Sequence, residues 1–169
     1  MRYGYGNSSG LIGGEMLKQA ARIDIMPVAY KGNPQALTDL ISGSIEAMVI
    51  DLNNGIPQLK TGKIRAIGML PGKRSGVLPE LPTLAETVAP GFDVWAWGGI
   101  FAPAGTPREI VKRLSEEIAK FAGRADIKDR LLGVGVELDY AGPEEFSAFL
   151  KTEAVRWTDM ARAAGIKPQ

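Results

Sequence analysis

The chain has 169 residues with 20 Lys and Arg against 19 Asp and Glu, a net charge of +1, and neither Cys nor His. This balance provides no electrostatic footprint for nucleic acid or for an anionic membrane surface. The missing residue types exclude a Cys/His metal site, a thiol nucleophile and a serine-histidine triad. Catalysis would depend on carboxylate, lysine or tyrosine chemistry, and no convergent acid/base pair is evident.

Residues 2–70 alternate short strand and helix signals, which is typical of a three-layer α/β domain. A first strand leads into a helix that starts near Gly10, and a second strand is expected at residues 25–30. The next helix has Asn33 in the N-cap position and Pro34 in the first helical position.

The following segment contains two more expected strands. Residues 45–52 form an apolar run that predicts a buried strand, and Asn53 and Asn54 are expected to cap a short helix after it. Residues 64–70 predict another strand. The Pro, Gly, Lys and Arg of residues 71–82 indicate a surface loop before one or two helical turns.

Residues 92–101 predict an extended strand with Trp95 and Trp97 on one face. Two interpretations of this pair are open. The indoles could stack on a ligand, or they could fill the core or cover a hinge, and the large area that each indole buries favours packing.

The chain becomes helical after this point. Residues 106–109 have the sequence of a capping box with proline at the first helical position. Further helices are expected at 125–132 and 143–164, whereas residues 136–139 form the one short strand signal. The apolar stripes of these helices need a sheet or other helices to cover them, so the tail is expected to be half of a second domain.

The loop after the first strand is the first candidate site. Gly4, Gly6 and Gly10 have the spacing of a weak dinucleotide fingerprint, but the next strand ends in Tyr30-Lys31-Gly32 where an acidic residue would hold a ribose. A plain glycine-rich turn is an alternative. A third possibility is an anion site, because backbone N–H groups and hydroxyls meet at a helix N-terminus.

Two further loops follow strands, at residues 30–34 and 51–54. Ligands of α/β sheets collect at the carboxyl ends of strands, so three such loops indicate more than any one of them. In the second loop a ligand carboxylate could take the helix N–H groups. Alternatively, Asn33 satisfies those groups itself as the N-cap and Lys31 is solvated.

Several motifs in order give the chain a resemblance to the Bug family, the periplasmic substrate-binding proteins of tripartite tricarboxylate transporters. The resemblance covers nearly all of the chain. Its motifs are Gly6-Asn7-Ser8-Ser9-Gly10, Val28-Ala29-Tyr30-Lys31-Gly32-Asn33-Pro34, Lys60-Thr61-Gly62-Lys63, Leu78-Pro79-Glu80-Leu81-Pro82-Thr83, Ala102-Pro103-Ala104-Gly105-Thr106-Pro107 and Ala164-Gly165-Ile166.

The resemblance implies an α/β fold of the type II periplasmic-binding-protein class. Residues 1–97 would form the complete ligand-binding α/β domain. Residues 98–169 would supply the strand crossover and C-terminal helices of an incomplete second domain. The N-terminal part of that domain, with its own glycine-rich loop, is expected to be missing. The chain would then be a fragment, or a short relative completed by a homodimer or domain-swapped partner.

The resemblance also implies a function without bond chemistry and without a cofactor or metal. A small carboxylated solute would be held by loop N–H groups and hydroxyls and passed to membrane permease subunits in the periplasm. The implied ligand-binding residues are Gly6, Asn7, Ser8, Ser9, Gly10, Tyr30, Lys31, Gly32, Asn33, Asp51 and Asn53. Two other hypotheses are a ligand-sensing domain of a transcription regulator, which shares this general fold, and an enzyme that uses carboxylates or Lys31.

Overall fold

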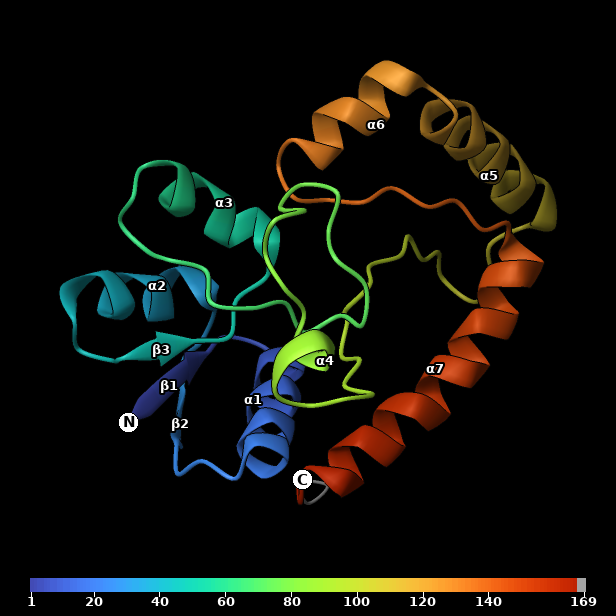
Figure 1. The fold of residues 1–169 in the computed structure, drawn as a ribbon. Coiled ribbons are helices and arrows are strands. Elements are labelled where there is room, and N and C mark those ends of the chain that lie inside the picture. The colour runs from blue at the N-terminus through green and yellow to red at the C-terminus, as the bar shows by residue number, and fades with distance from the viewer. Residues whose placement is uncertain (167–169) are drawn as a thin grey trace. The chain divides into compact units, whose positions relative to one another are not determined.

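A computed structural model of the chain describes residues 1–166 (Figure 1). The chain divides into two compact units, which we call unit 1 (residues 1–96 with 160–166) and unit 2 (residues 97–159). Within the described residues, all strands belong to unit 1. No helix in this part of the chain is both long and apolar enough to cross a membrane.

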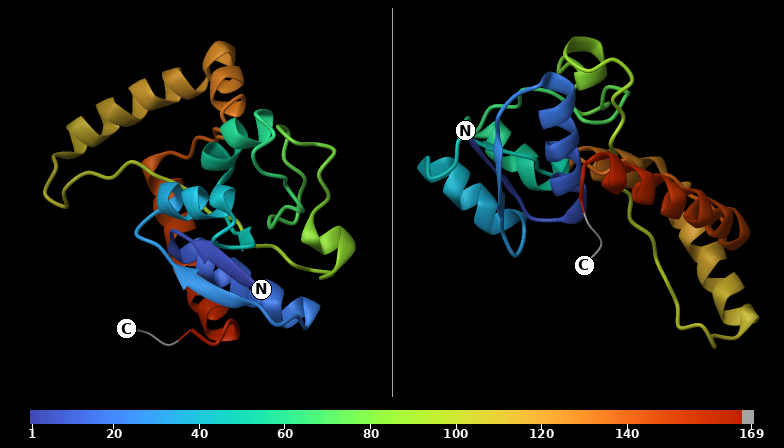
Figure 2. Two further views of the ribbon diagram at one scale, coloured as in Figure 1. Left: turned by 90° about the vertical axis from the view of Figure 1, so that its left-hand side faces the viewer. Right: turned by 90° about the horizontal axis from the view of Figure 1, so that it is seen from below.

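Unit 1 is built on a parallel sheet with the strand order β2-β1-β3. The strands are β1 (Arg2–Tyr5), β2 (Met26–Ala29) and β3 (Ala47–Met48), and they are connected by α1 (Ser8–Ala21) and α2 (Asn33–Ser42). The connection through α1 runs from the central strand β1 to β2, and the connection through α2 runs from β2 back across β1 to β3, so the two run in opposite directions. Because such crossovers are right-handed, α1 and α2 cover opposite faces of the sheet (Figures 1 and 2). The predicted α/β class is confirmed.

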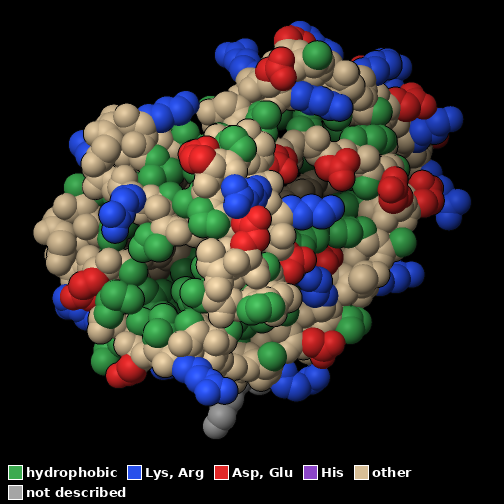
Figure 3. All heavy atoms as spheres, viewed as in Figure 1, with side chains coloured by type: hydrophobic (Ala, Val, Ile, Leu, Met, Phe, Trp, Pro, Cys, Tyr) green, Lys and Arg blue, Asp and Glu red, His purple; other side chains and the backbone are tan. Residues whose placement is uncertain are grey.

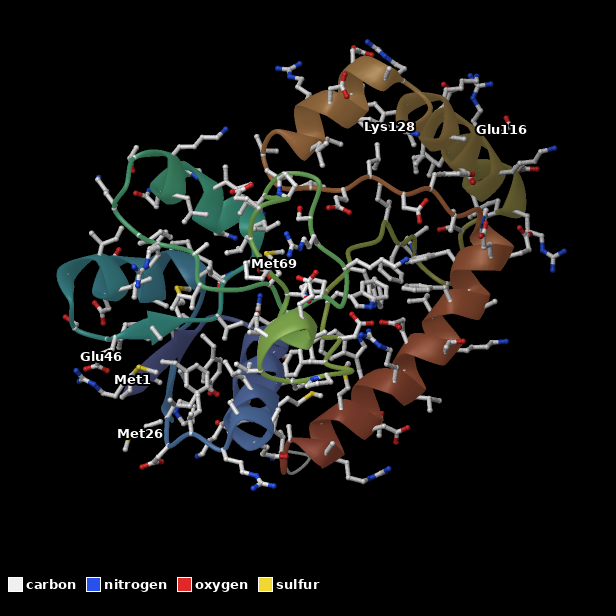
Figure 4. The ribbon with its side chains drawn as sticks, viewed as in Figure 1. Met1, Met26, Glu46, Met69, Glu116 and Lys128 are labelled. Carbon is white, nitrogen blue, oxygen red and sulfur yellow. The ribbon has the colours of Figure 1, made fainter. Side chains whose placement is uncertain are left out.

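The amino ends of the strands gather at one edge of this sheet, where Figure 4 labels Met1, Met26 and Glu46. The N–H of Met26 donates to the backbone oxygen of Met1 at 2.9 Å, and the guanidinium of Arg2 pairs with the Glu46 carboxylate at 3.0 Å. The carboxyl ends of the strands, with the loops that the sequence singles out, therefore lie at the opposite edge.

The core of unit 1 is centred on Tyr3, which is 2% exposed. Its ring lies so close to Gly14 of α1 that a Cβ there would overlap it, and its hydroxyl donates to Glu15 Oε1 at 2.9 Å. Burial and this bond raise the pKa of Tyr3 above its ordinary range. Each buried apolar side chain contributes roughly 1.5–3 kcal/mol. Others in this core are Ile12, Ile25, Ala36, Ile45 and Ile56.

Three predicted strands are shorter or absent. The run 45–52 contributes only β3, because α3 (Leu52–Lys60) already begins at its end. Residues 64–70 form a single bridge, between Met69 and Thr83, and residues 92–101 form no strand. An apolar extended segment becomes a strand only where a neighbour completes the hydrogen-bond ladder, and periodicity does not reveal the neighbour.

The short helix expected after the 71–82 loop is confirmed as α4 (Leu84–Thr87). Thr83 Oγ1 accepts the N–H of Glu86 at 3.2 Å, and Glu86 Oε2 accepts the N–H of Thr83 at 2.8 Å, which is a capping box. Arg74 from the loop pairs with the same carboxylate at 3.0 Å. The Thr83 N–H, and then Arg74, lower the pKa of Glu86.

Unit 2 contains the helices α5 (Arg108–Ala122) and α6 (Ala125–Leu132) and most of α7 (Pro143–Ala163), as predicted. The capping box expected at 106–109 is wrong. The N-cap of α5 is Pro107, which has no side-chain acceptor to offer. The strand expected at 136–139 is also absent, so no strand lies within residues 97–159.

The helices of unit 2 cover little apolar surface. Of its described residues, two are buried, Ala122 and Glu153. Along α5 the predicted stripe is half exposed, with Ile110 at 48%, Leu114 at 50% and Phe121 at 46%. The uncovered tail expected from the sequence is therefore present in the structure.

Candidate functional site

The carboxyl ends of β1, β2 and β3 lie at one edge of the parallel sheet, and each is followed within a few residues by a helix. Residues 6–7, 30–32 and 49–51 form these connections into α1, α2 and α3. Such an edge collects helix N-termini, whose first backbone N–H groups lack intrahelical acceptors. The predicted site residues therefore belong to one edge of unit 1.

Asn7 caps the first of these helices. Its backbone is extended, and its Oδ1 accepts the Gly10 N–H at 2.8 Å and the Ser9 hydroxyl at 2.9 Å. Its backbone oxygen accepts the N–H of Leu11 at 3.2 Å. Because asparagine supplies this cap, α1 begins at Ser8, two residues before the predicted Gly10.

The carboxylate of Asp51 joins the three connections. Its Oδ2 accepts the side-chain N–H of Asn7 at 2.8 Å and that of Asn33 at 2.8 Å. We call these three residues the Asp51 junction. Hydrogen bonds to an ionised acceptor contribute about 1.5–3 kcal/mol each where they are shielded from water. The junction therefore fixes the loops after β1 and β2 against the end of β3.

The side chain of Asn33 is not an N-cap, which corrects the alternative in which it satisfies the helix donors itself. The N-cap of α2 is Gly32, and no side chain caps this helix. Asn33 is the first helical residue, 7% exposed, and its amide turns to Asp51 instead. Its Oδ1 has no hydrogen-bond partner within residues 1–166.

Gly6 permits this close approach of two loops. A Cβ at Gly6 would overlap the backbone of Gly32 and Asn33 and would lie 2.6 Å from Asn33 Oδ1. Any larger residue would push the β2–α2 connection away from the β1–α1 loop. The glycine is therefore required for loop packing, whatever the loop binds.

Two backbone donors of the first loop remain available. The cap takes the N–H of Gly10 and the helix takes that of Leu11, but within residues 1–166 no acceptor takes those of Ser8 and Ser9. Ser8 is exposed and Ser9 is half-buried. Aligned peptide dipoles favour negative charge at this position by about 0.3–1 kcal/mol.

Other predicted site residues lie outside the junction. The Tyr30 hydroxyl donates to Asp39 Oδ2 at 2.8 Å, and this bond raises the pKa of Tyr30. Lys31 is exposed. Asn53 is also exposed and accepts a hydrogen bond from Asn54 at 3.0 Å. The expected cap by Asn53 and Asn54 is wrong, since Asp51 is the N-cap of α3.

The groups of this arrangement donate and accept hydrogen bonds. Its hydrogen-bonded set contains amides, hydroxyls, backbone N–H groups and one carboxylate, without a Lys or Arg. On the face in Figure 3 the charges of both signs are interspersed. The sequence does not predict the hydrogen bond from Asn33 to Asp51. Its one sequence signal is that Asp51 is an acidic residue directly after an apolar run.

Comparison with known proteins identifies the family. A family model described as tripartite tricarboxylate transporter family receptor matches residues 2–166. The chain belongs to this family. The resemblance to Bug proteins is thereby confirmed, together with the periplasmic-binding-protein fold.

Three relatives illustrate the likeness. The solved structure of Rhodopseudomonas palustris Rpa4515 with adipate is 32% identical with a TM-score of 0.94, covering 100% of this chain and 57% of that chain. Periplasmic binding protein BugD is 26% identical with a TM-score of 0.85, covering 100% and 58%. A UPF0065 protein from the tcbD-tcbE intergenic region of Pseudomonas sp. strain P51 is 34% identical over 143 residues, 84% of this chain and 43% of that protein.

The chain thus spans about half the length of these relatives. Over its own length the chain shares the fold of the relative solved with adipate. Which residues touch a ligand in this chain remains a prediction.

Proposed function

We propose that this chain is a solute-binding part of a tripartite tricarboxylate-type uptake receptor and that unit 1 contacts a small carboxylated solute. Family membership supports the receptor role, and a relative solved with adipate, a dicarboxylate, supports the ligand class. The proposal rests on the N–H groups of Ser8 and Ser9 at the N-terminus of α1, which have no acceptor among residues 1–166 and lie next to two serine hydroxyls.

In the proposed binding mode, the N–H groups of Ser8 and Ser9 and the Ser8 hydroxyl donate to one ligand carboxylate. Asn7 and Gly10 shape this loop through the cap. Gly6 and Asn33 position it through the Asp51 junction. Tyr30, Lys31, Gly32, Asp51 and Asn53 are the proposed border of the site.

The expected affinity of this half-site is low. Three charge-assisted bonds of about 1.5–3 kcal/mol each and a helix terminus of about 0.3–1 kcal/mol are offset by the cost of immobilising the ligand, about 4–15 kcal/mol. A micromolar complex needs about 8.2 kcal/mol and a millimolar one about 4.1 kcal/mol. We therefore expect millimolar binding by the chain alone.

A proline substitution tests the donor assignment. Ser8→Pro removes one unused N–H, and proline is tolerated at the first helical position after a residue that is already extended, as Asn7 is. Ser8→Ala removes only the hydroxyl and is the control. In NMR titrations with adipate and citrate we expect Ser8→Pro to bind about tenfold more weakly than Ser8→Ala.

Three outcomes would contradict the proposal. Equal affinity of Ser8→Pro and Ser8→Ala would show that the Ser8 N–H does not donate to the ligand. No shift in any loop resonance at tens of millimolar carboxylate would refute carboxylate binding by unit 1. Micromolar binding by a chain verified as monomeric would refute the half-site energetics.

We also propose that residues 1–97 form the ligand-binding domain and that the chain from residue 98 to 169 belongs to a domain completed by further polypeptide or by a second copy, with residues 160–166 returning to unit 1. The half-exposed stripe of α5 supports this. Light scattering measures whether the chain forms a dimer or larger oligomer. An oligomer that dissociates in Leu114→Glu would support completion by a second copy. A monomer that binds no apolar dye would contradict the need for completion.

The remaining parts of the proposal follow the family. The expected role is to carry the solute through the periplasm to the permease subunits in the membrane. BugD is itself described as a periplasmic binding protein. The family is one of receptors, which supports a role without catalysis. The relatives give no support to a transcription regulator.

A further inference from the structure

The chain passes between the two units twice, and the two passages differ in backbone structure. One lies at residues 96–97, in the segment between α4 and α5 that has neither helix nor strand. The other lies inside α7, between Asp159 and Met160. A helix maintains its own direction through backbone hydrogen bonds, whereas an extended segment without a ladder does not. Other contacts must therefore fix the first passage.

A buried carboxylate supplies such a contact. Glu153 of α7 is 3% exposed, and its Oε2 accepts the indole N–H of Trp97 at 2.8 Å and that of Trp157 at 3.0 Å. Arg156 lies 3.2 Å from the same oxygen. A buried charge requires this degree of compensation, and two indoles on one oxygen use most of its capacity.

The donors lie next to the passages. Trp97 is the first residue of unit 2, and Trp157 precedes its last residue, Asp159, by two positions. One oxygen atom therefore links the extended passage to the helical passage, although 56 residues separate Trp97 from Glu153.

Ring packing adds to this link. The Trp97 ring meets Phe146 and Phe149 of α7 edge-on, with centroid distances of 5.8 Å and 5.3 Å. A Cβ at Gly99 would overlap the Phe146 ring, so the backbone after Trp97 also lies directly on α7. Aromatic pairs of this geometry stabilise beyond their buried area.

We propose that Glu153 is a positioning residue that braces the extended passage at residues 97–99 against α7, so that this segment moves together with the helix. The brace lies within unit 2 and does not depend on which ligand unit 1 binds. It gives Trp97 a structural role within unit 2, distinct from stacking on a ligand.

Limited proteolysis of the whole chain tests the brace, because residues 97–101 lie in no helix or strand and contain the aromatic sites that chymotrypsin cleaves. Trp97→Phe retains an aromatic ring and removes the donor, and Glu153→Leu removes the acceptor. Both are expected to raise the rate of chymotrypsin cleavage within residues 97–101 about tenfold or more, since each breaks the bond that holds this segment on α7. Glu145→Leu, at an exposed position of the same helix, is the control and is expected to change the cleavage rate less than twofold.

The double variant separates a specific bond from general damage. If the bond is the brace, the double variant Trp97→Phe with Glu153→Leu is cleaved no faster than the faster single variant, and the Trp157 indole N–H loses protection from exchange in Glu153→Leu. Additive effects, or an unchanged cleavage rate within residues 97–101 in Trp97→Phe, would overturn the inference. If Glu153→Leu does not fold, the Trp97→Phe result alone decides.

Discussion

Removing the carboxylate of Asp51 is expected to destabilise unit 1 through one buried amide. In Asp51→Ala the side-chain N–H groups of Asn33, a residue only 7% exposed, lose their acceptor, which costs about 1–3 kcal/mol. Asn7 is exposed, so water replaces its bond and the added cost is small. The expected loss in free energy of unfolding is about 1–3 kcal/mol. Asp51→Asn retains a neutral acceptor and is expected to lose about 1 kcal/mol.

Urea unfolding followed by tryptophan fluorescence measures these changes. Asn53→Ala is the matched control, because Asn53 is exposed in the same helix and is expected to alter stability by less than about 0.5 kcal/mol. Combining Asp51→Ala with Asn33→Ala removes the orphaned amide, so the two losses are expected to be less than additive. A loss for Asp51→Ala no larger than for the control, or strict additivity within about 0.5 kcal/mol, would refute the junction.

Two more predictions concern loop packing and an ion pair. Gly6→Ala is expected to lower the free energy of unfolding by about 3 kcal/mol in the same assay, because the new Cβ overlaps the Asn33 backbone. Gly32→Ala is the control and is expected to be near neutral, since Gly32 has space for a Cβ and an extended backbone. Equal effects of the two variants would contradict the overlap. The Arg2 guanidinium and N–H lower the pKa of Glu46 from 4.5 to about 2, so its stabilising effect is present above pH 4.5 and lost as the pH falls through 2. A carboxyl NMR titration is expected to show this midpoint, and one that does not move in Arg2→Met would exclude the pairing.

Much of unit 1 could be predicted because its signals are local. Gly43 ends α2 in the left-handed conformation that glycine favours, as its position after the apolar positions of that helix indicates. Thr83 and Glu86 form a capping box over three residues of chain. Such features depend on φ and ψ and on neighbours within one turn, so the sequence contains all the information needed.

The sequence-based predictions are wrong where the structure of a segment depends on residues that are distant in the sequence. The 64–70 and 92–101 runs are apolar enough for strands, yet a strand needs a neighbour to complete its ladder. Asn33 has the sequence position of a cap, but a carboxylate 18 residues away takes its amide. The charge-assisted bond from its Nδ2 to the carboxylate orients the amide, and its Oδ1 accepts none of the helix N–H groups.

The sequence by itself determined the family, the α/β order of unit 1 and the three strand-end loops, because motif order and hydrophobic period are properties of the chain. Tertiary structure alone decided that Asp51 joins the loops, that no side chain fits at Gly6, and that Glu153 accepts the indole N–H of Trp97. These facts depend on which side chains meet across 18 to 56 residues. Folding brings such groups within hydrogen-bond distance, and no local propensity encodes the meeting.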